Sequence, residues 1–267
     1  MVAIQILSDL HLEAPKSYDI FEITPRAPCL ALLGDVGCLS KDFDDYSKFL
    51  LVQLGQFKIV LLVLGNHEPY HSSWATVKDD MTKFQENVCR KKEGGENLGE
   101  FVLLDRKRFD IDVGEDKVTI LGCTLFSNVD PASHDHVSFG VNDFYYTEEW
   151  DVEKHNEEHR RDVQWLKTQL EGLNGSGRKV AVFTHFSPTT DNRAVDPQHS
   201  NSTIKSAFST DLRDNSLWNE TICLWAFGHT HYNCDFEDDQ GKRLYTNQRG
   251  YYFSQSAGFN ASKVVEM

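Results

Sequence analysis

Short runs of apolar residues recur along the chain, and longer amphipathic stretches separate them. Six runs have the length and β-branched content of buried strands: Ala3–Ser8, Cys29–Leu33, Lys58–Leu64, Val118–Gly122, Lys179–Thr184 and Leu224–Phe227. Apolar residues at helical spacing predict helices over Asp42–Leu54, Trp74–Val88 and Val152–Leu170. Strands that alternate with helices predict a layered α/β fold, which we expect to form one domain over residues 1–267.

The C-terminal third has a different pattern. Tyr232–Phe236, Arg243–Thr246 and Tyr251–Phe253 predict consecutive hairpin strands. Two earlier segments, Ser127–Glu149 and Phe186–Asp211, show no clear periodicity. Because long structureless loops are uncommon inside compact domains, we expect both segments to be functional or disordered.

The composition narrows the class of partner. The chain carries 41 acidic and 27 basic residues, a net charge of −14. A protein that binds long nucleic acid needs a basic surface, so this balance argues against polymeric nucleic acid as a partner. No apolar run reaches the ~18 residues of a membrane span, and no basic secretory leader opens the chain. The six cysteines form no Cys-x-x-Cys pair. We therefore expect a cytoplasmic protein without a membrane partner, and its oligomeric state is not indicated.

Side chains that can bind metal follow five of the predicted strands. They are Asp9, His11, Asp35, Asn66, His67, His185, His229 and His231. Gly34, Gly65 and Gly228 stand where the chain has to turn sharply off a strand. In an extended segment, side chains two positions apart point to the same side, as in Asp9-x-His11. Because ligands bind at the carboxyl ends of strands in α/β sheets, we expect these side chains to converge.

Each of these motifs alone has an ordinary structural explanation, such as a turn or a hydrogen-bonded histidine. Together they do not, because so many imidazoles and carboxylates brought together without a cation would lose free energy through desolvation and repulsion. The sequence therefore predicts a metal centre. Imidazole and carboxylate ligands suit transition metals such as Mn, Fe or Zn, and the ligands do not distinguish among them.

In this order, the motifs resemble those of the calcineurin-like metallophosphoesterase superfamily. They are Asp9-x-His11, Gly34-Asp35, Gly65-Asn66-His67-Glu68, His185 and Gly228-His229-x-His231. The resemblance implies a four-layer α/β/β/α sandwich of two mixed sheets flanked by helices, with two metal ions at the sheet edges. It implies one metal held by Asp9, His11 and His231, and a second held by Asn66, His185 and His229. Asp35 would bridge the two metals, and His67 would lie near the substrate without being a ligand.

Departures from the best-known branches place the chain within the superfamily. After Asp35 the sequence reads Val36-Gly37-Cys38, which lacks the phosphate-binding arginine of the Ser/Thr protein phosphatases. The same stretch lacks the tyrosine ligand of the purple acid phosphatases. The chain therefore resembles the compact, phosphodiesterase-like members most.

The expected function is a dinuclear-metal phosphoester hydrolase. We expect a phosphodiesterase that acts on a small soluble phosphodiester, nucleotides included, with phosphomonoesterase activity at the same site. A DNA or RNA nuclease and a non-catalytic metal-binding scaffold are the alternatives. Asp35 and His67 are the expected catalytic residues, with His67 as general acid. Expected substrate contacts are Asn66, His67, Asn142, Phe186 and Arg193.

Overall fold

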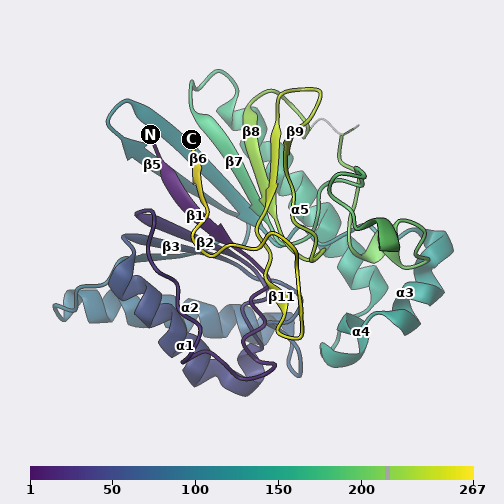
Figure 1. Cartoon of the computed structure of the whole chain (residues 1–267), viewed down its shortest axis with the longest axis horizontal. Coiled ribbons are helices and arrows are strands. Elements are labelled where there is room, and N and C mark those ends of the chain that lie inside the picture. Colours follow the sequence, from purple (N-terminus) through teal and green to yellow (C-terminus); the bar gives the residue numbers. More distant parts are fainter. Residues whose placement is uncertain (214–216) are drawn as a thin grey trace.

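Two mixed β-sheets pack face to face in the computed structural model, which describes residues 1–213 and 217–267 (Figure 1). The first sheet has the order β13-β1-β2-β3-β4. Its strands are β1 (Ala3–Leu7), β2 (Cys29–Leu33), β3 (Ile59–Val63), β4 (Glu100–Leu103) and β13 (Val264–Glu266). Strands β1 to β4 run parallel, and β13 pairs with β1 antiparallel, so the two chain termini lie side by side.

The second sheet has the order β5-β6-β7-β8-β10-β9. Its strands are β5 (Lys107–Val113), β6 (Asp116–Cys123), β7 (Lys179–Thr184), β8 (Ile222–Phe227), β9 (Asp235–Glu237) and β10 (Arg243–Thr246). The four central strands are parallel, and the edge strands β5 and β9 are antiparallel to their neighbours. A separate hairpin consists of β11 (Gly250–Tyr251) and β12 (Ser254–Gln255).

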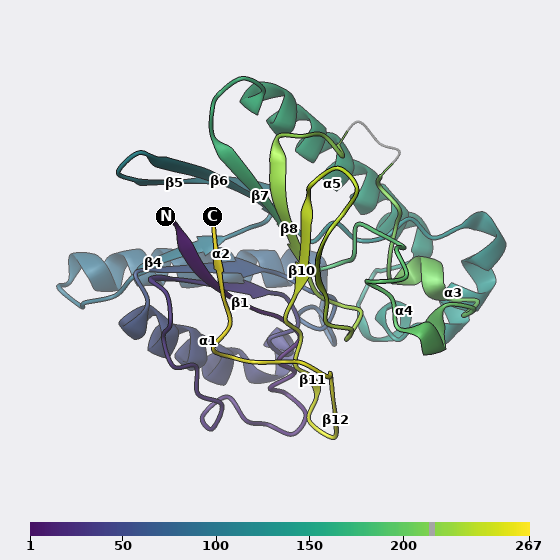
Figure 2. The same cartoon turned by 45° about the horizontal axis from the view of Figure 1, so that its top comes forward.

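Helices cover the outer face of each sheet. The first sheet packs against α1 (Leu39–Gln56) and α2 (Trp74–Glu93), and the second packs against α5 (Val152–Leu173) (Figure 2). These layers confirm the predicted four-layer sandwich. Among the described helices, none combines the length and the apolar character that crossing a bilayer requires.

Burial on both faces explains the unbroken apolar runs of the sequence. In β2, Leu30 and Leu32 contact the helix layer, whereas Ala31 and Leu33 belong to the core between the sheets. All five residues of this strand are buried. The six buried strands predicted from the sequence therefore agree with β1, β2, β3, β6, β7 and β8 to within about two residues at each end.

The two segments without clear periodicity have defined structure, so of the two expectations for them disorder is excluded. The segment 127–149 is ordered and contains η1 (Pro131–Ser133), α3 (His134–Gly140) and α4 (Asp143–Tyr146). The segment 186–211 contains the short helices η2 (Pro197–His199) and η3 (Lys205–Ala207). A small apolar cluster that includes Val137 and Ala207 joins the two segments. The predicted strand over 251–253 is wrong in its extent, because its last two residues form the turn of the hairpin β11–β12.

Candidate metal centre

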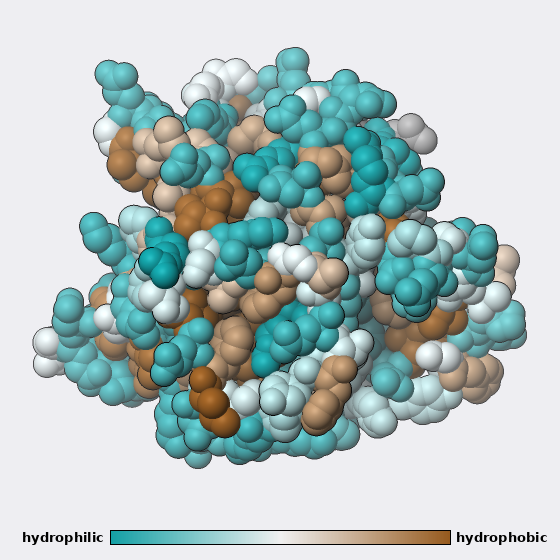
Figure 3. Space-filling model, viewed as in Figure 1, coloured by the Kyte–Doolittle hydropathy of each residue, from teal (hydrophilic) through white to brown (hydrophobic). Residues whose placement is uncertain are grey.

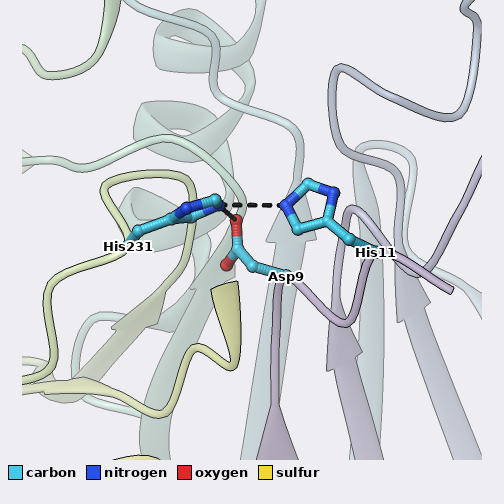
Figure 4. A group of neighbouring side chains, drawn as sticks. All are labelled: Asp9, His11 and His231. Atoms are coloured by element: carbon cyan, nitrogen blue, oxygen red, sulfur yellow. Dashed lines mark hydrogen bonds and ion pairs between the residues drawn. The ribbon is translucent and has the colours of Figure 1, made fainter. Parts of the chain in front are cut away.

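The candidate ligands come together where the carboxyl ends of both sheets meet. Nε2 of His231 lies 3.0 Å from Nε2 of His11 and 3.4 Å from Oδ1 of Asp9 (Figure 4). Nε2 of His185 lies 3.4 Å from Oδ1 of Asp35. The other oxygen of Asp35, Oδ2, lies 3.8 Å from Nε2 of His11. The carboxylate of Asp35 therefore presents one oxygen to each of two neighbouring groups of side chains.

Three groups of described side chains have ligand atoms close enough to share a cation; His11, Glu13 and His67 form one, and the other two contain only predicted ligands. Of these two, one contains Asp9, His11 and His231, and the other contains Asp35, His185 and His229. The amide of Asn66 belongs beside the second group, because its Oδ1 lies 2.9 Å from Nε2 of His185. All the side chains predicted as ligands thus lie in one cluster.

Unusual backbone conformation places these side chains. Asp9, His11, Asp35, His229 and His231 all have φ between 47° and 69°. The expectation that Asp9 and His11 share an extended segment is therefore wrong. Non-glycine residues adopt this left-handed region at a cost in free energy, and such strain concentrates at functional sites. Hydrogen bonds between neighbouring loops stabilise this left-handed conformation, for example the bond from the amide of His11 to the carbonyl of Asp35.

The glycines of the motifs allow close approach between these loops. A Cβ on Gly65 would stand 2.2 Å from Oδ1 of Asp35, and one on Gly228 would stand 2.1 Å from Oγ of Ser8. Only Gly34 among the three also requires positive φ, at 89°. Any side chain at these positions would displace the candidate ligands.

Glu68 connects the loops that follow β2 and β3. Its carboxylate accepts hydrogen bonds from the backbone N–H groups of Asp35, Val36 and Gly65 at 2.7 to 3.0 Å. The hydroxyl of Tyr46 donates to it as well, at 3.1 Å. Glu68 is fully buried, and the hydrogen bonds that its carboxylate accepts come from these backbone amides and from Tyr46. It ties the turn after β2 to the turn after β3.

The donor set fits a pair of transition metals. Nε2 of His229 is buried and has no hydrogen-bond partner among the described residues. Burial, followed by the nearby imidazole of His185, holds the pKa of His229 well below its usual range. Burial opposes ionisation of Asp9, but His231 and further imidazoles outweigh it and lower the pKa of Asp9. A neutral imidazole with a free lone pair beside an ionised carboxylate is the protonation pattern that metal ligands require.

His67 lies next to the candidate ligands and is held by a carboxylate. Its Nδ1 lies 2.8 Å from Oε1 of Glu13, and its Nε2 lies 3.9 Å from Oδ2 of Asp35. Burial opposes the protonation of His67. The carboxylates of Asp35 and Glu13 outweigh burial and raise the pKa of His67 to about 9. The imidazole can therefore carry a proton near neutral pH.

A pocket of about 340 Å³ opens on this cluster. Its base includes Asp35, Asn66, His67, His229 and His231, and its walls come from residues 140–143, residues 195–209 and Tyr251. Figure 3 shows this face of the molecule hollowed between the hairpin β11–β12 and the lobe that carries α3 and α4.

Some of the residues predicted to contact substrate line the pocket, and others do not. Asn142 lines the pocket together with Asn66 and His67. Phe186 does not, because it is fully buried and packs against the ring of His229, with 4.1 Å between centroids. Arg193 does not either. Its guanidinium is paired with Asp191 and lies over the ring of Phe236, outside the pocket lining.

The sequence did not indicate the roles of three residues of the site. Glu13 holds His67, and a regular alternation, Asp9-x-His11-x-Glu13, was the available signal. Asp143 accepts hydrogen bonds from Asn66 and Tyr70 at 2.8 and 2.6 Å and thereby orients the amide of Asn66. The ring of Tyr251 lies against His11, with 4.3 Å between centroids, and no local pattern marks it.

Comparisons with known proteins bear on the fold and on the family of the chain. An uncharacterized protein of Acanthamoeba polyphaga mimivirus is 27% identical over the whole chain and 97% of its own length. The crystal structure of a phosphopantetheinyl hydrolase from Mycobacterium tuberculosis superposes with a TM-score of 0.68 at 16% identity, covering 93% of this chain and 89% of that one. A dimetal phosphatase from Danio rerio gives a TM-score of 0.52 at 14% identity, covering 97% and 90%. At these identities the two structures establish similarity of fold.

The sequence model of one family extends over nearly the whole chain. It describes the calcineurin-like phosphoesterases and matches residues 3–251. With five motifs in order, two sheets in a four-layer sandwich and two groups of potential metal ligands at their common edge, the chain belongs to the calcineurin-like phosphoesterase family of metal-dependent hydrolases.

Proposed function

We propose that this protein is a dinuclear-metal phosphodiesterase for small organic phosphodiesters, nucleotides included, and that it also cleaves phosphomonoesters. The position of Asp35 carries the proposal, because its two oxygens face different groups of potential ligands. A carboxylate in that position suits two cations held side by side. Sites of this kind serve both diesters and monoesters, since the scissile phosphate is bound in the same way.

The proposed ligands follow from the two groups. Asp9, His11 and His231 would hold one cation, and Asn66, His185 and His229 would hold the other, with Asp35 shared. Mn, Fe and Zn suit this mixture of imidazole and carboxylate. When bound, such a pair of cations neutralises phosphate charge and lowers the pKa of a coordinated water.

His67 is the proposed general acid. Glu13 engages Nδ1 of the imidazole, which leaves Nε2 directed at the pocket. As the bond between phosphorus and the leaving oxygen breaks, the proton on Nε2 passes to that oxygen, and Glu13 stabilises the imidazolium before the transfer. Asp143 and Tyr70 hold Asn66 in the orientation that presents its oxygen to the site.

The walls of the pocket support a substrate with a planar organic group. Phe208 stacks on His229 inside the pocket, with 5.0 Å between ring centroids. Among the described residues, six aromatic side chains are exposed, and all lie in the segment 127–149 or in the hairpin β11–β12. They are Phe139, Tyr145, Tyr146, Tyr251, Tyr252 and Phe253, and of these Tyr251 lines the pocket. A planar ring can stack on Tyr251, and the amide of Asn142 in the pocket wall can pair with the edge of a heterocycle. A nucleoside has both features.

A substrate screen tests the proposal. Purified protein loaded with Mn²⁺ is assayed with bis-p-nitrophenyl phosphate, cyclic nucleotides, nucleotide sugars, glycerophosphodiesters and phosphomonoesters, with Asp35→Asn as the inactive control. Hydrolysis of small diesters that changes little between low and high salt supports the proposal. Preference for single-stranded DNA with a steep salt dependence would favour the nuclease. Stoichiometric metal without hydrolysis of any ester would favour the scaffold.

A further inference from the structure

The hairpin β11–β12 is anchored to the loops that carry the proposed ligands. The amide of Gly250 donates to the carbonyl of Asp9 at 3.0 Å, and the amide of Arg249 donates to the carbonyl of Ser8 at 3.0 Å. On the other side, Oε1 of Gln248 accepts a hydrogen bond from the amide of His231. The base of the hairpin is therefore bonded to both of these loops, and its first residues have a defined place beside the cluster.

Tyr251 belongs to this hairpin, and its side chain contacts three histidines of the candidate metal centre. Its ring lies at 31° to the ring of His11 and meets the ring of His231 nearly edge-on, at 71°. Its hydroxyl lies 3.3 Å from Nε2 of His67. The residue lines the pocket and is 44% exposed, so a ligand can reach it.

We propose that the hydroxyl of Tyr251 is a catalytic group that donates a hydrogen bond to the leaving-group oxygen, next to Nε2 of His67. This inference rests on the proposed function, because it takes His67 as the proton donor. Nε2 of His67 has to contact the leaving oxygen in order to protonate it. A hydroxyl that is already within hydrogen-bonding distance of that nitrogen is within reach of the same oxygen.

The hydroxyl and the imidazole have different tasks in this step. A water oxygen bonds to phosphorus and releases a proton to solvent as the bond between phosphorus and the leaving oxygen breaks. The electron pair of the broken bond stays on the leaving oxygen, and the proton of Nε2 forms the new O–H bond there. Tyr251 keeps its own proton and stabilises the charge that develops on the oxygen before that proton arrives. Its contribution should increase with the basicity of the leaving group, because a more basic oxygen accepts a stronger hydrogen bond.

The variant Tyr251→Phe tests this assignment, because it removes the hydroxyl and keeps the ring against His11. Two methyl phosphodiesters are compared, one with a p-nitrophenyl and one with an alkyl leaving group. We expect kcat/KM to fall about 10-fold for the alkyl ester and less than about 3-fold for the nitrophenyl ester. Tyr252→Phe, on the same hairpin, is the matched control and should change neither value. An equal fall for both esters, or no fall, would overturn the assignment.

A binding measurement separates this inference from the proposed function. Inorganic phosphate, whose fourth oxygen can take the position of the leaving oxygen, is titrated calorimetrically into Mn²⁺-loaded protein. We expect Tyr251→Phe to weaken phosphate binding about 5-fold, with the metal content unchanged. If the wild-type protein cleaves no ester, the proposed function fails, and the phosphate affinities still decide whether Tyr251 contacts the ligand. Equal affinities of wild type and variant would refute the contact.

Discussion

The carboxylate of Glu13 lies 2.8 Å from Nδ1 of His67, and the same oxygen lies 3.4 Å from Nδ1 of His11. One acidic side chain thus contacts Nδ1 of two imidazoles, and Nε2 of each imidazole lies near Oδ2 of Asp35, at 3.8 and 3.9 Å. Its charge favours protonation of His67. Burial opposes ionisation of Glu13, but these two imidazoles outweigh it and lower the pKa of Glu13 to about 2.

Replacing Glu13 by Gln keeps a hydrogen-bond acceptor and removes the charge. We expect kcat toward an alkyl phosphodiester to fall about 10- to 100-fold, as is usual when the outer partner of a site histidine is changed. Metal analysis of the variant should show an unchanged content. Glu22→Gln, on an exposed neighbouring position, is the control. Wild-type kinetics in Glu13→Gln would show that this carboxylate has no part in the reaction.

Asp35→Asn and His67→Ala should separate metal binding from proton transfer. Asparagine cannot supply the shared charge of Asp35, so the first variant should lose both cations and all activity. The second should keep both cations, and its rate should fall most for the ester with the poorer leaving group, by about 10²- to 10⁴-fold. Metal analysis and leaving-group comparisons measure these effects. A metal-free His67→Ala protein would mean that His67 is a ligand.

Glu68→Ala should destabilise the fold. The substitution leaves three buried N–H groups, those of Asp35, Val36 and Gly65, without their acceptor. At about 1–3 kcal/mol for each unsatisfied donor, the free energy of unfolding should fall by at least about 3 kcal/mol. Urea denaturation measures it, with the exposed Glu86→Ala as control. A loss below about 1 kcal/mol would show that water or another group replaces the carboxylate.

Gly65→Ala should weaken metal binding. The new methyl group would stand 2.2 Å from Oδ1 of Asp35, so the carboxylate or the loop has to move. Gly55→Ala is the matched control, because a Cβ at that position of α1 meets nothing within 4 Å. The control should bind metal normally and gain up to about 1 kcal/mol of stability from helix propensity. Equal metal affinity in the two variants, by competition with a chelator, would contradict this account.

His155 should make the stability depend on pH. Burial, with a smaller contribution from His159, lowers the pKa of His155 to about 3, while an unfolded histidine titrates near 6.5. Below about pH 6.5 the unfolded chain therefore binds a proton that the folded protein does not. The stability due to this neutral imidazole is present above that pH and is lost as the pH falls toward 3.

The variant His155→Gln can keep an acceptor for the amide of Ser127, which now donates to Nε2 at 3.1 Å. Between pH 7 and pH 5, the wild-type protein should lose about 2 kcal/mol more stability than this variant. Urea denaturation at both pH values gives the difference, in which the contributions of other groups cancel. Parallel loss in both proteins would mean that His155 also becomes charged in the folded state.

The sequence predicted the central strands and the residues of the candidate metal centre. It did not predict the edge strands β5 and β13 or the contacts that surround the centre. Strands buried on two sides, such as Cys29–Leu33, appear as unbroken apolar runs, and their ends point to the ligands that follow. Strand β5 was missed because it is an edge strand of mostly charged residues, and β13 was missed because three residues carry too little pattern. An unbroken apolar run marks a strand that is buried on both faces, and neither β5 nor β13 is buried on both faces.

The positions of Glu13, Asp143 and Tyr251 depend on contacts between distant segments. Tyr251 reaches His67 across 184 positions of sequence, and Asp143 reaches Asn66 across 77. The left-handed backbone of Asp9 and His11 is likewise set by hydrogen bonds to the neighbouring loop, and residue type alone does not predict it. Such relationships arise only when the two sheets meet.

The loops after β1, β2 and β3 supply candidate ligands from one sheet, and those after β7 and β8 supply them from the other. Each bound cation would therefore work as a removable crosslink at the edge where the two sheets meet. Its strength would follow the free metal concentration, since a ligand that binds only the native state stabilises it by RT ln(1 + [L]/Kd). Removal of the metal would then weaken the contact between the two sheets as well as stop turnover. The metal-free protein would be cleaved faster by proteases.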